Sequence, residues 1–133
     1  MVRFLIILIK YLKNKKISFL GVTFKPNTDD MREASSIPMI KYLNKKKSNI
    51  RYYDPSGEKH EFKKLKNVKY YNDISSACLN SDLIILHTEW NDFKLLNFKK
   101  IVKKNKFKVF DMRNIYSPSK MKKLKIDYFG IGR

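Results

Sequence analysis

The sequence predicts an α/β fold, a three-layer, Rossmann-like open sheet that is mostly parallel and carries helices on both faces. Two observations predict it. Short apolar runs typical of buried strands alternate along the chain with segments of helical periodicity, and this alternation favours right-handed βαβ units. The run Leu83–Leu86 is continuously apolar, as in parallel strands that are covered on both faces. The length of 133 residues suits one domain of this kind.

The first half of the chain begins with a helical pattern and then alternates. Apolar residues over 1–12 run all round a helix with no start signal, which is typical of the tail of a helix that is buried elsewhere or lacks its beginning. Residues 17–21 are a short apolar run closed by a glycine and predict a strand. Residues 37–47 combine apolar residues at helical spacing with lysines in the last turn, which suit the helix dipole. Asn49–Tyr53 predicts a second strand, followed by turn residues.

The second half continues the alternation. Asp73 is suited to cap a helix that runs to Leu79, because its carboxylate can accept from the free amides of the first turn. The other predicted elements are, in chain order, strands at 68–71 and 83–86, a helix at 98–104, a strand at 107–110, a helix at 119–124 and a last strand at 128–129.

The charge of the chain is strongly positive. Thirty Lys and Arg against 12 Asp and Glu give a net charge of +18, and 25 of the 30 cations are lysines. Such a charge suits a nucleic-acid partner. However, readers of nucleic acid favour arginine for forked contacts, no nucleic-acid motif is present, and the lysines are scattered over several helices and loops. We therefore favour a general drift of composition towards lysine at solvated positions, and a basic nucleic-acid-binding module remains the alternative of another class.

Cysteine content and hydropathy suggest where the protein works. Cys78 is the only cysteine, which excludes an internal disulfide and a site with several thiolates. The apolar run at residues 4–9 is far shorter than the roughly 20 residues that a membrane-spanning helix needs. We expect a cytoplasmic protein with no membrane partner.

The candidate site consists of residues that follow the predicted strands, because open α/β sheets bind ligands outside the carboxyl ends of their strands. Lys25, Arg32 and Arg113 would suit an anion such as a phosphate or diphosphate there. Phe24 and Trp90 could add flat apolar faces. The alternative for Arg32 is an ion pair with a neighbouring acid, which would only brace the loop. Further residues at the possible edge of the site are Thr88, Glu89, Trp90 and Asp111.

Four ordered motifs make the chain recognisable. Residues 21–36, then Tyr53-Asp54-Pro55, Thr88-Glu89-Trp90 and Asp111-Met112-Arg113-Asn114, resemble the C-terminal domain of the UDP-glucose 6-dehydrogenases, within the UDP-glucose/GDP-mannose dehydrogenase family. The resemblance covers residues 15–130. The first and third motifs are closer to UDP-glucose enzymes than to those acting on GDP-mannose or UDP-N-acetylmannosamine, which remain the alternatives. One departure is Ala34-Ser35-Ser36, where many members have a proline, and we expect only a local effect on the helix start.

The resemblance implies a function for the whole enzyme. Members of this kind oxidise UDP-glucose to UDP-glucuronate with NAD as cofactor, and they are homo-oligomers built of a dinucleotide-binding domain, a central helix and a UDP-sugar-binding domain. By resemblance, residues 1–13 are a remnant of the central connecting helix and residues 14–133 are the UDP-sugar-binding domain. The chain would then be a fragment, a truncated product or one half of a split enzyme, whose partners are UDP-glucose and a separately encoded N-terminal half.

The resemblance also assigns roles to residues. Phe24 and Lys25 fall where the family contacts the UDP-sugar, Arg113 falls on the arginine that reaches it, and Arg32 falls on the arginine that approaches NAD. No catalytic residue is expected here, because the chain has neither the family's Gly-x-Cys-Phe-Pro-Lys-Asp segment nor a Gly-x-Gly-x-x-Gly fingerprint. Cys78 is expected to be a core thiol and His87 a satisfied or edge-facing histidine, and no metal site is expected.

Overall fold

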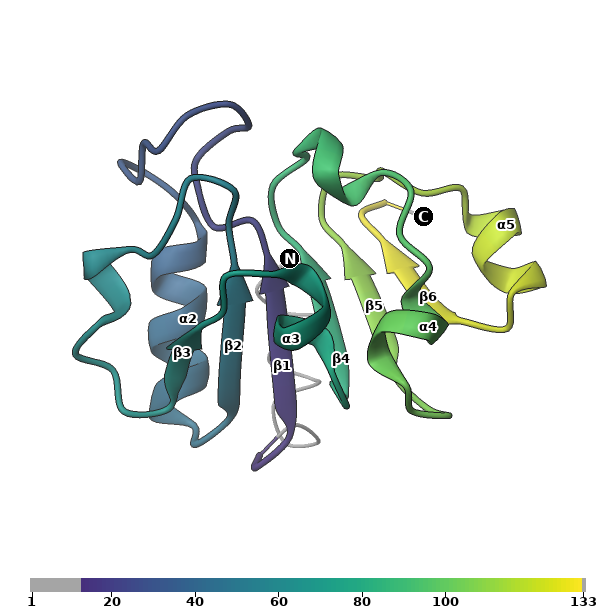
Figure 1. Ribbon diagram of the computed structural model, residues 1–133, viewed down its shortest axis with the longest axis horizontal. Coiled ribbons are helices and arrows are strands. Elements are labelled where there is room, and N and C mark those ends of the chain that lie inside the picture. The colour runs from purple at the N-terminus through teal and green to yellow at the C-terminus, as the bar shows by residue number, and fades with distance from the viewer. Residues whose placement is uncertain (1–12, 133) are drawn as a thin grey trace.

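The sheet of the computed structural model has six strands, and all six are parallel (Figure 1). The structure describes residues 13–132. The strand order is β3-β2-β1-β4-β5-β6, so the predicted open α/β sheet is confirmed, and it is entirely rather than mostly parallel. The strands are β1 (Lys16–Leu20), β2 (Asn49–Tyr53), β3 (Val68–Tyr70), β4 (Leu83–Leu86), β5 (Lys108–Asp111) and β6 (Asp127–Gly130).

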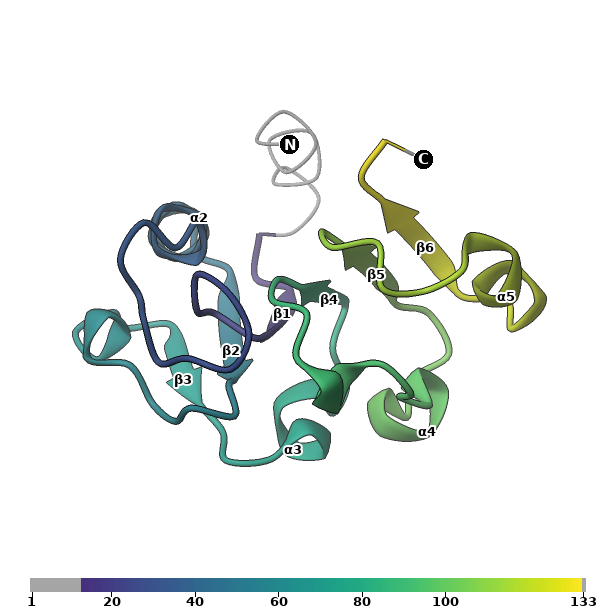
Figure 2. The same cartoon turned by 90° about the horizontal axis from the view of Figure 1, so that it is seen from above.

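Helices cover both faces of the sheet, as the view from above shows (Figure 2). The helix α2 lies on one face, and α3 and α4 lie on the other. Each face therefore has its own layer of apolar side chains. The helices are α2 (Ser36–Lys45), α3 (Ile74–Cys78), α4 (Phe98–Val102) and α5 (Pro118–Lys123), with short 3-10 turns η1 (His60–Phe62) and η2 (Asn91–Phe93).

The continuous apolar run of β4 is explained by these two layers. Successive side chains of a strand point to opposite faces. Leu83 and Ile85 pack in the layer under α2, whereas Ile84 and Leu86 pack in the layer under α4. All four are fully buried. A strand with a single buried face would instead have alternated polar and apolar residues.

Side-chain caps fix most of the helix starts. Asp73 accepts a hydrogen bond from the Ser76 amide at 2.7 Å, which confirms the predicted N-cap of α3. Asn97 and Ser117 cap α4 and α5 in the same way. The start of α2 is different, because the side chain of Ser35 caps nothing and turns to another partner, described below.

One buried cation was not predicted. Arg51 of β2 lies among buried polar groups, where its guanidinium donates to the Leu79 carbonyl at 2.7 Å and to the Ser81 hydroxyl at 2.8 Å. Burial lowers the pKa of Arg51 from its usual value. The guanidinium thus supplies a donor to the C-terminal end of α3, where backbone carbonyls lack partners.

The order of the strands also locates the point where a ligand would bind. The chain runs from β1 to β2 and β3 on one side, then returns to place β4 on the other side of β1. The crevice outside the carboxyl ends of β1 and β4 is therefore the topological switch point, where open α/β sheets bind ligands. The predicted remnant of a connecting helix at residues 1–13 lies outside the described residues, except for Lys13, which is in a turn before β1.

Candidate functional site at the carboxyl ends of the strands

Gly21 and Thr88 make the tightest contact at the switch point. Gly21 follows β1 with a φ of +79°, a backbone conformation that favours glycine. A Cβ atom at Gly21 would lie 2.6 Å from Cβ of Thr88, which follows β4. The Thr88 hydroxyl donates to the Thr23 carbonyl at 2.9 Å. The loops that leave β1 and β4 are thus held together at the centre of the sheet.

His87 extends this contact to α2. Its Nδ1 lies 2.9 Å from the Thr88 hydroxyl oxygen, and its Nε2 lies 2.9 Å from the Ser35 hydroxyl oxygen. Because the Thr88 hydroxyl hydrogen is used on the Thr23 carbonyl, Nδ1–H donates to Thr88 and Nε2 accepts from Ser35. Burial, followed by the charge of Arg113, lowers the pKa of His87 to about 4. The ring is therefore neutral, as expected of a satisfied histidine.

Trp90 is part of the scaffold and not a surface for a ligand. Its indole is only 9% exposed and packs in the apolar layer with Phe93 and Phe98. Its Nε1–H donates to the Thr23 hydroxyl at 3.3 Å, and that hydroxyl donates to the Lys25 carbonyl at 2.9 Å. The expectation that Trp90 offers a flat apolar face is wrong, because the ring is buried in the apolar layer.

Asp54 supports the same loop from the end of β2. One carboxylate oxygen accepts from the amides of Val22 and Thr23 at 2.8 and 3.3 Å. The other accepts from the amide and hydroxyl of Ser56, at 2.9 and 2.6 Å. Asp54 is 1% exposed, so these donors replace water around its charge. These bonds from the end of β2 therefore fix the backbone just before Phe24.

Arg113 joins the loop after β5 to the other two. Its Nε–H donates to the His87 carbonyl at 3.0 Å, and its Nη2 donates to the Phe24 carbonyl at 3.4 Å. The side chain is exposed. Phe24 is 45% exposed, and Lys25 beside it is also exposed. The structure therefore brings Phe24, Lys25 and Arg113 together at one edge, with an aromatic face and two cations open to a ligand.

Arg32 has a partner of its own in the same loop. Its Nε lies 3.1 Å from one oxygen of Asp30 and its Nη2 lies 3.1 Å from the other, and its amide donates to Asp30 as well. These bonds hold the pKa of Asp30 below its usual value. The Arg32 side chain is 89% exposed. The arrangement is that of the bracing ion pair, which was the alternative interpretation of this residue.

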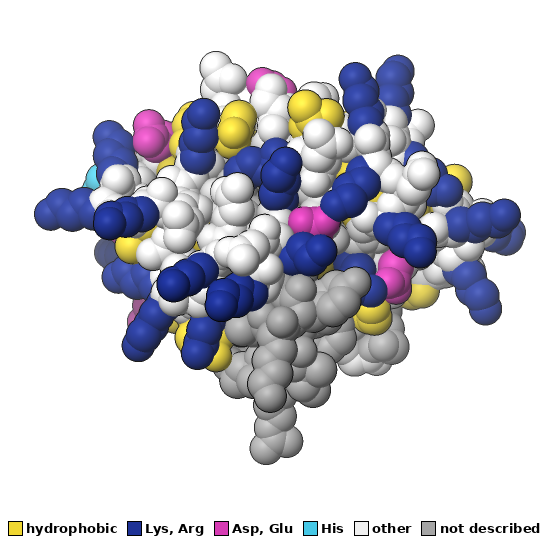
Figure 3. All heavy atoms as spheres, turned by 90° about the horizontal axis from the view of Figure 1, so that it is seen from below, with side chains coloured by type: hydrophobic (Ala, Val, Ile, Leu, Met, Phe, Trp, Pro, Cys, Tyr) yellow, Lys and Arg dark blue, Asp and Glu magenta, His cyan; other side chains and the backbone are white. Residues whose placement is uncertain are grey.

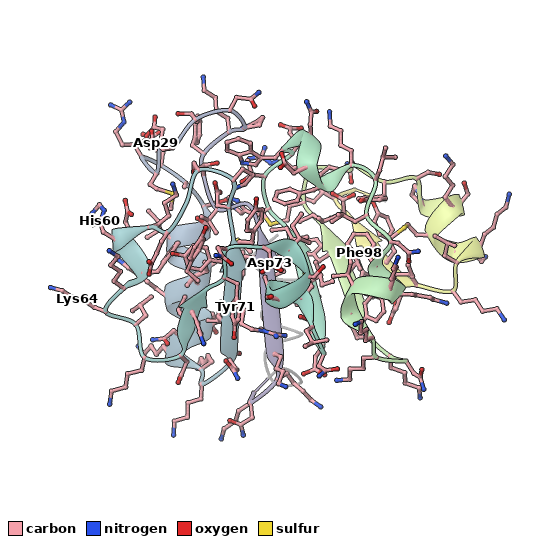
Figure 4. All side chains as sticks on the ribbon, in the orientation of Figure 1. Asp29, His60, Lys64, Tyr71, Asp73 and Phe98 are labelled. Atoms are coloured by element: carbon pink, nitrogen blue, oxygen red, sulfur yellow. The ribbon has the colours of Figure 1, made fainter. Side chains whose placement is uncertain are left out.

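A shallow acidic hollow of about 450 Å³ lies beside this loop, between residues 29–32 and 56–61. Asp29 and His60 both line this hollow and lie on the same side of the molecule (Figure 4). His60 is exposed, as expected of a solvated histidine, and lies 3.4 Å from Glu61. Among residues 13–132, no group of three His, Cys, Asp or Glu side chains could hold a metal ion.

Asp111 and Thr88 belong to the scaffold, whereas Glu89 is open to solvent. Asp111 is fully buried and accepts from the amides of Arg113 and Tyr116, at 3.2 and 2.9 Å, and from the Tyr128 hydroxyl at 2.7 Å. Its carboxylate shapes the loop that carries Arg113. Of the residues predicted at the edge of the site, Thr88, Trp90 and Asp111 are buried, and only Glu89 is exposed.

This chain resembles known proteins over most of its length. Residues 18–118 match the family model described as the UDP binding domain of the UDP-glucose/GDP-mannose dehydrogenase family. The chain belongs to this family. It is 39% identical over 124 residues to the UDP-glucose 6-dehydrogenase of Rickettsia felis, covering 91% of this chain and 28% of the relative. It is 36% identical over 123 residues to UDP-glucose 6-dehydrogenase YwqF of Bacillus subtilis, covering 90% of this chain and 28% of that relative.

Solved structures of nucleotide-sugar dehydrogenases share the fold. A UDP-glucose dehydrogenase of Pyrobaculum islandicum superposes with a TM-score of 0.72 at 25% identity, over 96% of this chain and 28% of that one. An NDP-N-acetyl-D-galactosaminuronic acid dehydrogenase of Methanosarcina mazei Go1 gives a TM-score of 0.82 at 20% identity, over 99% of this chain and 28% of that one. The chain thus spans less than a third of the length of these family members. None of the described helices is long and apolar enough to cross a membrane.

The scaffold of this family member was largely missed by reasoning from sequence. Thr23, Ser35, Asp54 and His87 were not predicted as parts of the site, although together they hold the loop of Phe24 and Lys25. One sequence signal could have found Asp54, namely an aspartate directly after a predicted strand and before a proline, at the edge where ligands bind.

Proposed function

We propose that this domain binds the nucleotide half of a UDP-sugar at the edge formed by Phe24, Lys25 and Arg113. The observation that carries the proposal is the position of Arg113. Its guanidinium bridges the carbonyls of His87 and Phe24, which belong to the loops after β4 and β1, and it remains exposed at the switch point. A cation fixed in this way is ready for an anion before the ligand arrives.

The chemistry of the three side chains suits a nucleoside diphosphate. A guanidinium offers forked donors to a phosphate, and the Lys25 ammonium offers a mobile point charge. The exposed ring of Phe24 offers an apolar face to the base or ribose. The acids near these cations are used elsewhere, because Asp54 and Asp111 are saturated by donors and Asp30 is paired with Arg32.

For the whole enzyme we propose an NAD-dependent UDP-glucose 6-dehydrogenase that converts UDP-glucose to UDP-glucuronate. The names of the curated relatives support UDP-glucose over GDP-mannose or UDP-N-acetylmannosamine. NAD would be held chiefly by parts of the enzyme outside this chain; Arg32, which is paired with Asp30 but whose side chain is 89% exposed, would be the contact from this domain. We infer a cytoplasmic homo-oligomer that includes the dinucleotide-binding and cysteine-bearing parts.

Titration calorimetry of UDP into the folded 133-residue chain tests the binding proposal. Removing a charged hydrogen-bond donor costs about 1.5–3 kcal/mol, so Lys25→Ala and Arg113→Ala should each weaken binding by tenfold or more. The matched control is Lys94→Ala, because Lys94 is an exposed lysine in the loop after β4. Magnesium should make no difference. No detectable heat at millimolar UDP, from a sample with the circular dichroism of a folded chain, would contradict the proposal.

Two further measurements separate the finer parts of the proposal. If the site prefers UDP, a titration with GDP should show weaker binding than the titration with UDP. An assay of NAD⁺ reduction with UDP-glucose and the purified chain should show no turnover, because the sequence has no segment that resembles the family's cysteine loop. Turnover by this chain alone would mean that the chemistry has been assigned to the wrong part of the enzyme.

A further inference from the structure

The two ends of the sheet carry different charges. The segments that enter the strands contain twelve lysines and two aspartates; these segments, which we call the lysine edge, are residues 13–16, 45–49, 66–67, 80–82, 103–108 and 125–127. The loops that leave the strands contain nine acids and five cations; they are residues 21–35, 54–59, 71–73, 87–97 and 111–116. The view from below shows many cationic and few acidic side chains on this side of the molecule (Figure 3).

This division argues against a uniform drift of composition. Drift would place lysine at solvated positions everywhere, and the loops at the carboxyl ends are solvated too, yet they contain more acids than cations. The helix dipole favours cations at helix ends and accounts for part of the excess, such as Lys45 in the last turn of α2. It does not account for Lys15 or Lys66, which lie in connections outside the described helices. Twelve of the 24 lysines of residues 13–132 thus lie at this end of the sheet, against three in the loops at the other end, and the remaining nine lie outside both sets of segments.

The lysine edge has two hollows and a large surplus of charge. A hollow of about 220 Å³ is lined by Lys15, Lys106 and Lys125, among others, and a second of about 620 Å³ includes Lys47 and Lys66. The two aspartates of the edge are each matched by one lysine, in the pairs Lys104–Asp82 and Lys108–Asp127. Ten lysine charges of this edge thus remain in excess of its carboxylates.

The shape of the edge suits a linear anion. Six strands begin side by side, and at about 4.8 Å between strands the row of their starts is roughly 24 Å long. A nucleic-acid duplex of that length carries about fourteen phosphates, of which roughly half can face one side. Lysine gives point charges to a phosphate backbone without reading bases, so the expected recognition is independent of sequence.

Two other polyanions fit this edge less well. Single strands are held by aromatic side chains that stack on bases, but the exposed large aromatic residues of the described chain, Phe24 and Tyr42, lie outside the lysine edge. Adsorption on an anionic membrane usually adds apolar side chains that insert between the headgroups. Of the exposed leucines, Leu79 and Leu124 border the edge singly and none lies within it.

We propose that the lysine edge is a second binding surface of this protein, which takes the phosphate backbone of a nucleic-acid duplex without sequence preference. It lies at the opposite end of the sheet from the UDP site and is independent of it. Along the sequence these lysines look scattered, which was one reason to favour a drift of composition over the alternative of a nucleic-acid-binding module. Their segments meet in the fold, because every connection that enters a parallel strand ends at the same edge.

Fluorescence anisotropy with a labelled 24-base-pair duplex of arbitrary sequence tests the proposal on the 133-residue chain. With about seven phosphates neutralised, the logarithm of the association constant should fall with the logarithm of salt concentration with a slope of about −6. Affinity should then drop more than a thousandfold between 50 and 200 mM salt. The variant Lys15→Gln/Lys106→Gln/Lys125→Gln should make the slope shallower by about 2.7, since three phosphate contacts are lost.

The matched control separates position from total charge. Lys41→Gln/Lys64→Gln/Lys120→Gln removes the same net charge from exposed lysines outside the edge, and Lys64 points away from the fold at its side (Figure 4). The slope of this control should equal that of the unaltered chain. The proposal is overturned if both triple variants flatten the slope equally, if no duplex binds at 50 mM salt, or if vesicles with 30% phosphatidylserine bind and the duplex does not. A failure of UDP to bind would contradict the proposed UDP site but not this duplex-binding surface.

Discussion

Gly21→Ala should destabilise the domain by more than a glycine replacement normally does, because two separate costs fall on one residue. The φ of +79° is unfavourable for alanine by about 1–2 kcal/mol. The new Cβ would also lie 2.6 Å from Cβ of Thr88 and 3.1 Å from its amide nitrogen, so the backbone after β1 or β4 must shift. Overpacking of this kind costs about 1–3 kcal/mol. The sum is about 2–5 kcal/mol, against a usual total stability of about 5–15 kcal/mol.

Gly57→Ala is the matched control for this prediction. Gly57 also has a positive φ, of +97°, but nothing lies within 4 Å of the position where its Cβ would be. Gly57→Ala should therefore lose only the free energy of the unfavourable φ, with no loss from overpacking. Thermal unfolding followed by circular dichroism measures both, and for a domain of this size the melting temperature should fall by about 10 °C or more for Gly21→Ala and by about 5 °C for Gly57→Ala. Equal shifts would refute the close contact between Gly21 and Thr88.

Three other perturbations address the scaffold. Asp54→Asn should cost about 2–3 kcal/mol in urea unfolding, because an amide group replaces an oxygen that accepts two hydrogen bonds. The pKa of His87 is about 4 in the folded chain and about 6.5 in the unfolded chain, so the unfolded chain takes up a proton first as the pH falls. The free energy of unfolding should therefore fall by about 3 kcal/mol between about pH 6.5 and pH 4, and His87→Gln should remove that loss. The Cys78 thiol, buried with its pKa raised to about 12, should react with Ellman's reagent only after denaturation, and prompt native reaction would contradict its burial.

The fold could be predicted from sequence because its signals are local. The apolar runs of β1 and β4 and the carboxylate at the start of α3 each report on their own neighbourhood, and the short connections leave few ways to arrange βαβ units. The all-parallel order follows from the same units. Arg51 could not be predicted, because its partners Leu79 and Ser81 are distant in sequence and meet it only through the pairing of strands.

The site could be predicted only where side chains remain exposed. Phe24, Lys25 and Arg113 were identified by their place after strands, and the structure brings them together. Trp90 was misjudged because a side chain after a strand can turn inward as well as outward, and only packing decides which. The hydrogen bonds from Asp54 to the amides of Val22 and Thr23 and from His87 to Ser35 join residues that are more than 30 apart in the chain, so no local pattern predicts them.

The division of charge gives the molecule a strong electric dipole along its strands. The two ends of the sheet are about 15 Å apart, since the central strands β1 and β4 have five and four residues at roughly 3.3 Å each. In 0.15 M salt the screening length is about 8 Å, so each end is electrically isolated from the other, whereas at 0.01 M salt it is about 30 Å and the whole domain acts as one field. A nucleotide in dilute buffer is then drawn to both ends, and the apparent stoichiometry of UDP should exceed one there and fall to one at physiological salt.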